Sequence, residues 1–185
     1  MNDLKDHAER GDVQAQFILG MMHLHGHGEK VWRTSIEGVP ESKSEAKRWF
    51  LAAAKGGFEW GMYDYAKLCE EDDPAESYSW FCKAAMRGLP DAQVAMIRQH
   101  FKAERLPGAG WAGGGPHTRE SILYSERNGA FKPDIIEAYK WALIAAQQNH
   151  PAVTRTNEFE ILECRMSDEE IAEAKSRADS FYPTY

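Results

Sequence analysis

The chain contains one pattern three times, and this internal repetition constrains its fold more than any other feature. The three segments are EAKRWFLAAAKG from Glu45, ESYSWFCKAAMRG from Glu76 and EAYKWALIAAQQN from Glu137. In each, a tryptophan stands four residues before the first of two adjacent alanines. Residues four apart share one face of an α-helix, and alanines on that face let a neighbouring helix approach closely. Each segment is therefore predicted to be a helix that packs against another helix, with its tryptophan in the core.

A helix end is predicted three residues after the second alanine of each segment. These ends are Gly57, Gly88 and Asn149, and the fragment 8–11 ends in the same way at Gly11. Glycine and asparagine adopt the left-handed backbone that terminates helices. Three of these ends are followed by a second predicted helix: QAQFILGMMH, WGMYDYAKLC and DAQVAMIRQH. These helices carry a small residue at the equivalent position, namely Ala15, Gly61 and Ala92.

The spacing of the ends indicates helix pairs separated by loops of variable length. Successive ends are 46, 31 and 61 residues apart, and the excess lies in two insertions, roughly Gly28 to Ser44 and Ala103 to Lys132. The segment MSDEEIAEAKSRADSF is predicted as a last helix, with Ser167 and Glu170 forming a capping box. The sequence thus predicts an all-α fold, an α/α solenoid (superhelix) of about three helix pairs with two loop insertions and a C-terminal capping helix.

The string AQFILGMMHLHGHG followed by EAKRWFLAAAKGG resembles a Sel1-like repeat. Units of that family read roughly A-Q-x-x-L-G-x-x-Y-x-x-G-x-G and then A-x-x-W-x-x-x-A-A-x-x-G. The second and third repeats lack the GxG turn and replace the Leu-Gly pair by Tyr65-Ala66 and Met96-Ile97, so they are degenerate. The resemblance covers most of residues 8–165 and implies a TPR-like, bacterial protein-binding repeat.

One domain is expected over residues 1–185. Its repeats would cover approximately 8–56, 57–87 and 88–149, with the second insertion at 103–132 inside the third repeat. The capping region would be 150–185.

Composition limits the classes of partner and the compartment. A formal net charge of -7 and a pI near 5.5 disfavour nucleic acid, because such a surface repels phosphates. No stretch is apolar enough to insert into a membrane, and the charged start MNDLKDHAERGD is unlike a signal peptide. Three widely spaced cysteines, Cys69, Cys82 and Cys164, indicate buried, reduced thiols. We expect a cytoplasmic protein, or a periplasmic or secreted one if a signal peptide has been removed.

Histidines and one glycine-rich string raise the possibility of cofactor chemistry. His23, His25 and His27 have spacings that can share a metal ion, but Gly26 and Gly28 would end the helix, and the repeat alignment makes His23 and His100 packing residues. The string GAGWAG at 108–113 matches G-x-G-x-x-G without the strand and helix that dinucleotide binding requires. We therefore expect neither metal nor cofactor; the role of the Gly-rich stretch 106–116 is left open.

Two features raise the possibility of hydrolytic chemistry. Ser44 to Lys47 spells S-x-x-K without the companion motifs of penicillin-recognising enzymes, so Ser44 is predicted to be a helix N-cap. His117, Glu120 and Tyr124 stand near one another in the second insertion. They leave a hydrolase as an alternative, although no complete set of nucleophile, base and orienting residue accompanies them.

The resemblance implies that the helices carrying Ala15, Gly61 and Ala92 line the inner surface of the solenoid. Their outward faces, at 100° per residue, mix aromatic and charged side chains. The predicted partner-binding residues are Gln14, Phe17 and Met21, then Trp60, Tyr63, Asp64 and Lys67, then Asp91, Val94 and Arg98, with Ile18 and Ala95 on the same faces. The alternative is that the aromatic side chains pack beneath the insertions, which carry Trp32 and Trp111.

The preferred function is a non-enzymatic interaction module or adaptor that binds a protein or peptide on a concave helical groove. Aromatic residues and arginine are the side chains that dominate binding energy at such surfaces. An exported bacterial virulence factor or surface antigen with the same binding fold is the second possibility, and the hydrolase is the third.

Overall fold

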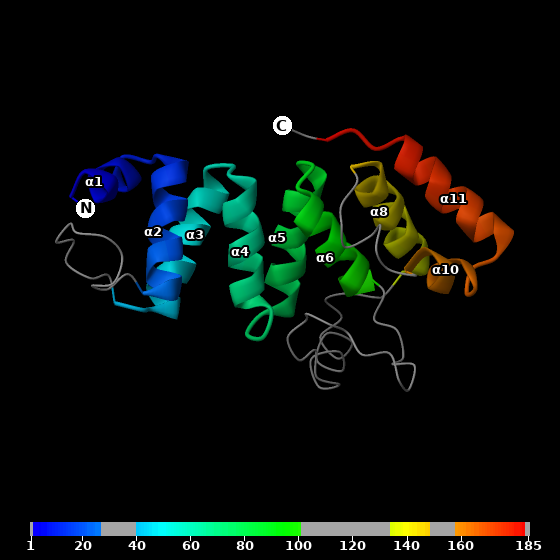
Figure 1. The fold of residues 1–185 in the computed structure, drawn as a ribbon, viewed down its shortest axis with the longest axis horizontal. Coiled ribbons are helices and arrows are strands. Elements are labelled where there is room, and N and C mark those ends of the chain that lie inside the picture. Colours follow the sequence, from blue (N-terminus) through cyan, green and yellow to red (C-terminus); the bar gives the residue numbers. More distant parts are fainter. Residues whose placement is uncertain (1, 27–39, 101–133, 149–157, 184–185) are drawn as a thin grey trace. The chain divides into compact units, whose positions relative to one another are not determined.

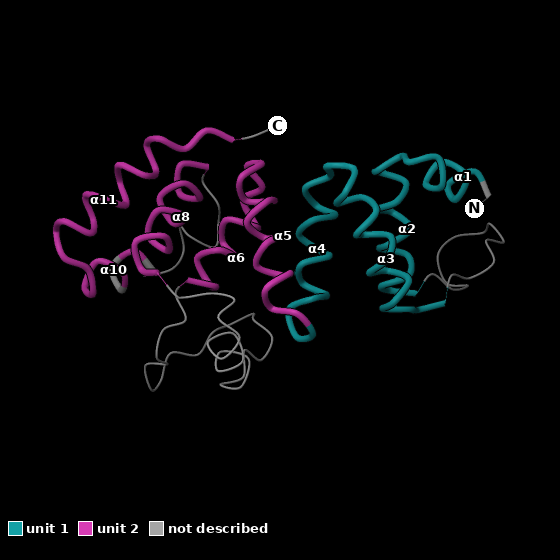
Figure 2. Tube along the Cα trace, turned by 180° about the vertical axis from the view of Figure 1, so that it is seen from behind, with its two compact units in different colours: residues 1–72 teal, residues 73–185 magenta. Residues whose placement is uncertain are grey.

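The computed structural model describes residues 2–26, 40–100, 134–148 and 158–183 (Figure 1). Within these ranges the regular elements are helices, and no strand occurs. No helix among the described residues is long and apolar enough to cross a membrane. The chain divides into two compact units, residues 1–72 and 73–185 (Figure 2), and each is described by itself.

Unit 1 contains α1 (Asn2–Glu9), α2 (Val13–His25), α3 (Lys43–Lys55) and α4 (Glu59–Cys69). Helix α2 packs on α1 and α3, and α3 packs on α4, so consecutive helices form the predicted pairs (Figure 1). Small residues allow the close approach: a Cβ atom added to Gly61 would lie 2.8 Å from the Cβ of Ala53. Trp49, 7% exposed, and Leu19, 4% exposed, lie in the core as the repeat pattern predicts.

Unit 2 contains α5 (Pro74–Met86), α6 (Pro90–His100), α8 (Ile135–Gln147), α10 (Glu158–Glu163) and α11 (Asp168–Asp179). Helix α8 packs on α6, α10 and α11, and α6 also packs on α5. The second alanine pair is fully buried at Ala84 and Ala85, and Trp141 is 1% exposed.

The predicted core position of Trp80 is wrong. Its side chain is only half-buried, and its Nε1 donates to Glu76 Oε1 at 3.5 Å within the same helix. The fully buried aromatic side chain of α5 is instead the next residue, Phe81, at 2% exposure. The pattern therefore gives the helix and its alanine face correctly, but not the burial of this tryptophan.

The helix ends follow the predicted chemistry at three of the four predicted positions. Gly11, Gly57 and Gly88 have φ values of 97°, 94° and 90°, in the left-handed region that glycine adopts without strain. Asn149 lies outside the described residues. Ser167 and Glu170 form the predicted capping box of α11.

The N-cap of α3 is Ser42, not Ser44. Ser42 has an extended backbone, and its Oγ accepts a hydrogen bond from the Glu45 amide at 3.3 Å. Ser44 is already inside the helix, where its Oγ contacts that of Ser42 at 3.1 Å. The helix starts two residues earlier than expected because Ser42 and Glu45 have the serine-to-glutamate spacing of a helix start.

Candidate functional site

Two large apolar side chains of unit 1 are exposed to solvent, and both belong to the helices predicted to bind a partner. Ile18 on α2 is 46% exposed and Trp60 on α4 is 39% exposed. Among the described residues of the whole chain, Tyr182 in unit 2 is the other exposed large hydrophobic residue. Isolated exposed apolar residues are common, so the surroundings of Ile18 and Trp60 decide whether they form a site.

An aromatic contact joins α2 to the start of α4. The ring centroid of Phe17 lies 5.2 Å from that of Phe58 in an edge-to-face arrangement, and 5.5 Å from that of Phe50. Phe17 neighbours Ile18 in the sequence, and Phe58 is two residues before Trp60. Phe17 is half-buried by this packing, so the expectation that it projects freely is only partly correct.

On α4, Trp60 and Tyr63 form a second aromatic pair. Their ring centroids are 6.3 Å apart with planes at 87°, so the edge of one ring meets the face of the other. Lys67 Nζ lies 5.3 Å from the centroid of Tyr63 and 3.4 Å from Asp64 Oδ1. Tyr63 and Asp64 are half-buried, whereas Lys67 is exposed. The two aromatic rings thus lie beside an ion pair, in which Asp64 neutralises the charge of Lys67.

We call these side chains of α2 and α4, the two helices linked by the Phe17–Phe58 contact, the aromatic face. It consists of Phe17, Ile18 and Met21 on α2 and Trp60, Tyr63, Asp64 and Lys67 on α4. Met21 is half-buried, and the predicted residue Gln14 is exposed one turn before Ile18 on the same helix. The seven residues combine aromatic area, a flexible methionine and one ion pair, and aromatic residues and methionine are enriched at protein interfaces.

The predicted residues of α6 belong to unit 2, and they do not form the exposed face expected of them. Val94 is 4% exposed and Ala95 is 8% exposed, so the prediction of a solvent-facing surface is wrong for both. Asp91 and Arg98 are half-buried. Helix α6 contacts both α5 and α8, and packing on two sides covers positions that a helix with one packed face would expose.

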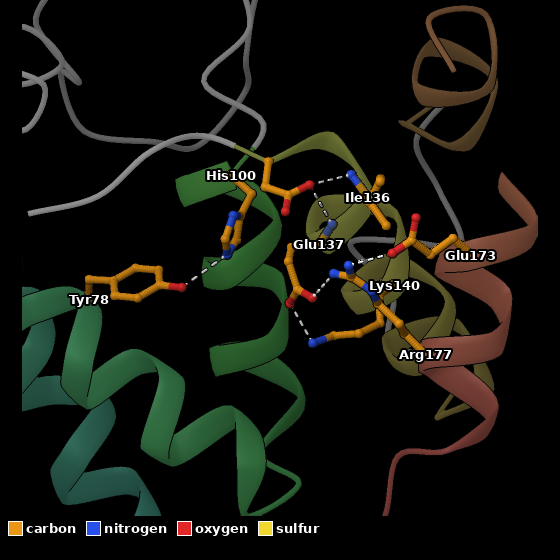
Figure 3. Close-up of polar contacts among 8 residues, drawn as sticks. Tyr78, His100, Ile136, Glu137, Lys140, Glu173 and Arg177 are labelled. Carbon is orange, nitrogen blue, oxygen red and sulfur yellow. Dashed lines mark hydrogen bonds and ion pairs between the residues drawn. The ribbon is translucent and has the colours of Figure 1, made fainter. Parts of the chain in front are cut away.

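A polar cluster between α8 and α11 gathers several titratable groups (Figure 3). Glu137 on α8 forms ion pairs with Lys140 on the same helix and with Arg177 on α11, whose Nη1 lies 2.7 Å from Glu137 Oε1. Arg177 also donates to Glu173 Oε1 at 2.6 Å. Figure 3 shows that these side chains converge between α8 and α11, so the cluster attaches the capping helix to the repeat before it.

Beside this cluster, the Tyr78 hydroxyl lies 3.2 Å from Nε2 of the buried His100. Burial raises the pKa of Tyr78 to about 12. Burial also raises the pKa of the Cys82 thiol, against the opposing effect of Lys140. For Glu137, burial alone would raise the pKa, but hydrogen bonds from Lys140 and Arg177 outweigh it and lower the pKa. These directions favour a neutral phenol, a neutral thiol and a paired carboxylate, which are the states of a structural network rather than of activated catalytic groups.

Several residues considered for chemistry can now be placed. Nδ1 of His23 lies 3.4 Å from the carbonyl oxygen of Pro40, and His25 is exposed, whereas His27 lies outside the described residues. The part of the chain that the structure describes contains no group of three potential metal ligands. The GAGWAG string and the set of His117, Glu120 and Tyr124 also fall outside it. The prediction of buried thiols holds for Cys69 but is wrong for Cys164, which is exposed.

Sequence reasoning did not include Glu59 among the site residues. Glu59 precedes Trp60 on the same exposed arc of α4, and its half-buried side chain has no hydrogen-bond or ion-pair partner among the described residues. Its place beside the aromatic pair could have been read from the 100° helical spacing. The Glu137 cluster was not predicted either.

The architecture defines a class of protein, that of helical-repeat proteins built from antiparallel helix pairs. The Sel1 repeat model matches residues 13–58, 61–89 and 122–150, more than half of the chain, and the chain therefore belongs to the Sel1 repeat family. Sel1 repeats are generally protein-interaction modules.

One solved structure agrees with this assignment. The chain is similar to a Sel1 repeat protein from Oxalobacter formigenes, with 27% identity, a TM-score of 0.54 and coverage of 83% of this chain and 92% of that one. A second similar structure is c5321, described as a protective antigen in uropathogenic Escherichia coli strains with an SLR fold. Its identity is 14% and its TM-score is 0.38, over 96% of this chain and 39% of that chain. No curated protein matches the chain.

Proposed function

We propose that the chain is an interaction module that binds a segment of another protein through the aromatic face of unit 1. The observation that carries the proposal is the simultaneous exposure of Ile18 and Trp60 on two helices joined by the Phe17–Phe58 contact. An aromatic side chain held in a fixed orientation loses little conformational entropy on binding, and the Tyr63 contact holds Trp60 in this way. Membership in the Sel1 repeat family supports the same function.

The proposal is tested with a displayed library of random peptides selected on the intact chain. Binders are resynthesised, and their affinities are measured for the unmodified chain, Trp60→Ala and Ile18→Ser. Loss of Trp60 should weaken binding by about thirtyfold, corresponding to the ~2 kcal/mol of a residue central to an interface. Because Trp60 is 39% exposed, its removal should lower the melting temperature much less than removal of Trp49, which is 7% exposed.

Tyr182→Ala is the matched control, since Tyr182 is an aromatic residue of unit 2 with 80% exposure. Its loss should leave peptide affinity unchanged. Binders whose affinity is the same for Trp60→Ala and the unmodified chain would place the binding site elsewhere. A melting temperature lowered as much by Trp60→Ala as by Trp49→Ala would make Trp60 a core residue.

A further inference from the structure

Three of the four tryptophans in the described helices, namely Trp49, Trp80 and Trp141, share one feature. Each has a lysine or arginine of its own helix over its ring, at a distance from the ring centroid that permits a cation–π interaction. The pairs are Arg48 with Trp49 at 4.8 Å, Lys83 with Trp80 at 3.9 Å and Lys140 with Trp141 at 4.3 Å. Each of these three indole rings therefore has a cation of its own helix over it.

Trp60 departs from this arrangement. Within the described residues no lysine or arginine lies over its ring, and its aromatic partner is Tyr63. The neighbouring cation, Lys67, is over the Tyr63 ring and is neutralised by Asp64. Trp60 is 39% exposed, so its indole combines open area with the negative ring face that attracts cations.

The residue before Trp60 carries the opposite charge from the residue before two of the other tryptophans. Arg48 precedes Trp49 and Lys140 precedes Trp141, and both side chains reach the following ring. Glu59 has the same place relative to Trp60, and its carboxylate has no hydrogen-bond or ion-pair partner among the described residues. Glu59, next to Trp60 in the sequence, would therefore attract a cation that settles over the indole instead of supplying one.

We infer that Trp60 and Glu59 together bind an arginine of the partner segment. This inference rests on the proposed function and gives the chemistry of the partner: an arginine flanked by apolar residues that contact Ile18 and Phe17. Arginine fits better than lysine because the planar guanidinium stacks on an indole while its edge donates to a carboxylate. The chain's net charge of -7 favours the approach of a basic segment.

Glu59 has an ordinary structural role that must be separated from this one. It lies in the first turn of α4, where a negative charge stabilises the partial positive charge of the helix start. A purely structural Glu59 would affect the melting temperature and not the choice of peptide. Binding selectivity therefore distinguishes the two roles.

The experiment repeats the random-peptide selection on the intact chain, on Glu59→Gln and on Glu59→Lys. Binders of the unmodified chain should be enriched in arginine next to apolar residues. This enrichment should fall on Glu59→Gln and give way to acidic residues on Glu59→Lys. Glu41→Gln is the control, because Glu41 is an exposed acid of unit 1 outside the aromatic face. It should leave the enrichment unchanged.

A resynthesised binder then gives the size of the effect. Replacing its arginine by citrulline keeps the shape and removes the charge, and should weaken binding by about fivefold, as expected for loss of a partly exposed cation–π contact. On Trp60→Ala this replacement should make no further difference. Binders that depend on Trp60 but show no arginine enrichment, or tolerate citrulline, would overturn the arginine site and leave the proposed function intact. Binders independent of both Trp60 and Ile18 would overturn both.

Discussion

The ring of Phe50 on α3 occupies the space that a side chain at position 20 of α2 would need. A Cβ atom added to Gly20 would lie 2.5 Å from two carbon atoms of that ring, which is closer than real side chains approach each other. Phe50 is fully buried and therefore cannot move into solvent. This contact gives a physical reason for the glycine in the Leu-Gly pair of the first repeat: it sets how closely α2 and α3 pack.

Gly20→Ala should therefore destabilise the chain even though alanine favours helix formation. Overpacking of a core costs ~1–3 kcal/mol, and the gain in helix propensity offsets at most about 1 kcal/mol of this. Urea unfolding should show the loss. Gln14→Ala, an exposed change on the same helix, should alter the free energy of unfolding by less than ~0.5 kcal/mol. If the clash with the ring is the cause, Gly20→Ala should cost clearly less in a Phe50→Leu background, and equal costs would contradict it.

Two tryptophans at the same repeat position of unit 2 should differ in their contribution to stability. Trp141 is 1% exposed, so Trp141→Ala should cost ~3–5 kcal/mol, as expected for an aromatic cavity in a core. Trp80 is half-buried, and Trp80→Ala should cost roughly 1–2 kcal/mol because less apolar area is lost from the interior. Urea unfolding of both variants makes the comparison. Equal costs would mean that the repeat pattern, and not the observed burial, determines the contribution.

The features that the sequence predicted correctly depend on local spacing. The buried alanine pairs of α3 and α5, the left-handed glycines at 11, 57 and 88 and the capping box of α11 each require residues within one or two helical turns of one another. Such patterns are visible along the chain without knowledge of the tertiary contacts. The all-α repeat fold followed from them, as did the family.

The features that the sequence did not predict depend on contacts between distant residues. Val94 is buried because α6 packs on two helices, which its own periodicity does not reveal. Glu137 and Arg177 are 40 residues apart, so no local sequence motif indicates their ion pair. The aromatic face was predicted in part, since Ile18 and Trp60 are exposed while Phe17 packs against Phe58. The single domain, the binding role of these residues and the cytoplasmic location stay predictions.

The three cysteines should react with a thiol reagent at different rates. Cys164 is exposed and should be modified rapidly by a disulfide reagent in the native chain. Cys82 is half-buried, and burial raises the pKa of its thiol, so little reactive thiolate is present near neutral pH. Cys69 is fully buried and should react only after unfolding. Absorbance of the released thiol measures each phase, and Cys164→Ser should abolish the rapid one. A rapid phase that survives this substitution would mean that Cys82 or Cys69 is accessible to the reagent, which would contradict the burial of these two thiols.

The ion pair between Glu137 and Arg177 should make the attachment of α11 sensitive to acid. Hydrogen bonds from Lys140 and Arg177 outweigh burial and lower the pKa of Glu137 in the folded chain. A lowered pKa means that folding favours the ionised carboxylate. Its contribution to stability is therefore complete above the unfolded value of about 4.3 and is lost as the pH falls through the lower folded value.

Glu137→Gln should accordingly lower the free energy of unfolding at pH 7 by about 1 kcal/mol, the upper end for partly exposed ion pairs, because Glu137 pairs with two cations. Urea unfolding at a series of pH values from 7 down to 3 should show this difference shrinking below about pH 4, because the carboxylate becomes protonated first in the unfolded chain and then, at lower pH, in the folded chain. Glu173→Gln is the matched control, since the exposed Glu173 pairs with the same arginine and its loss should cost less. A difference between Glu137→Gln and the unmodified chain that stays constant down to pH 3 would show that the amide disturbs packing, and that the charge of Glu137 does not hold α11 in place.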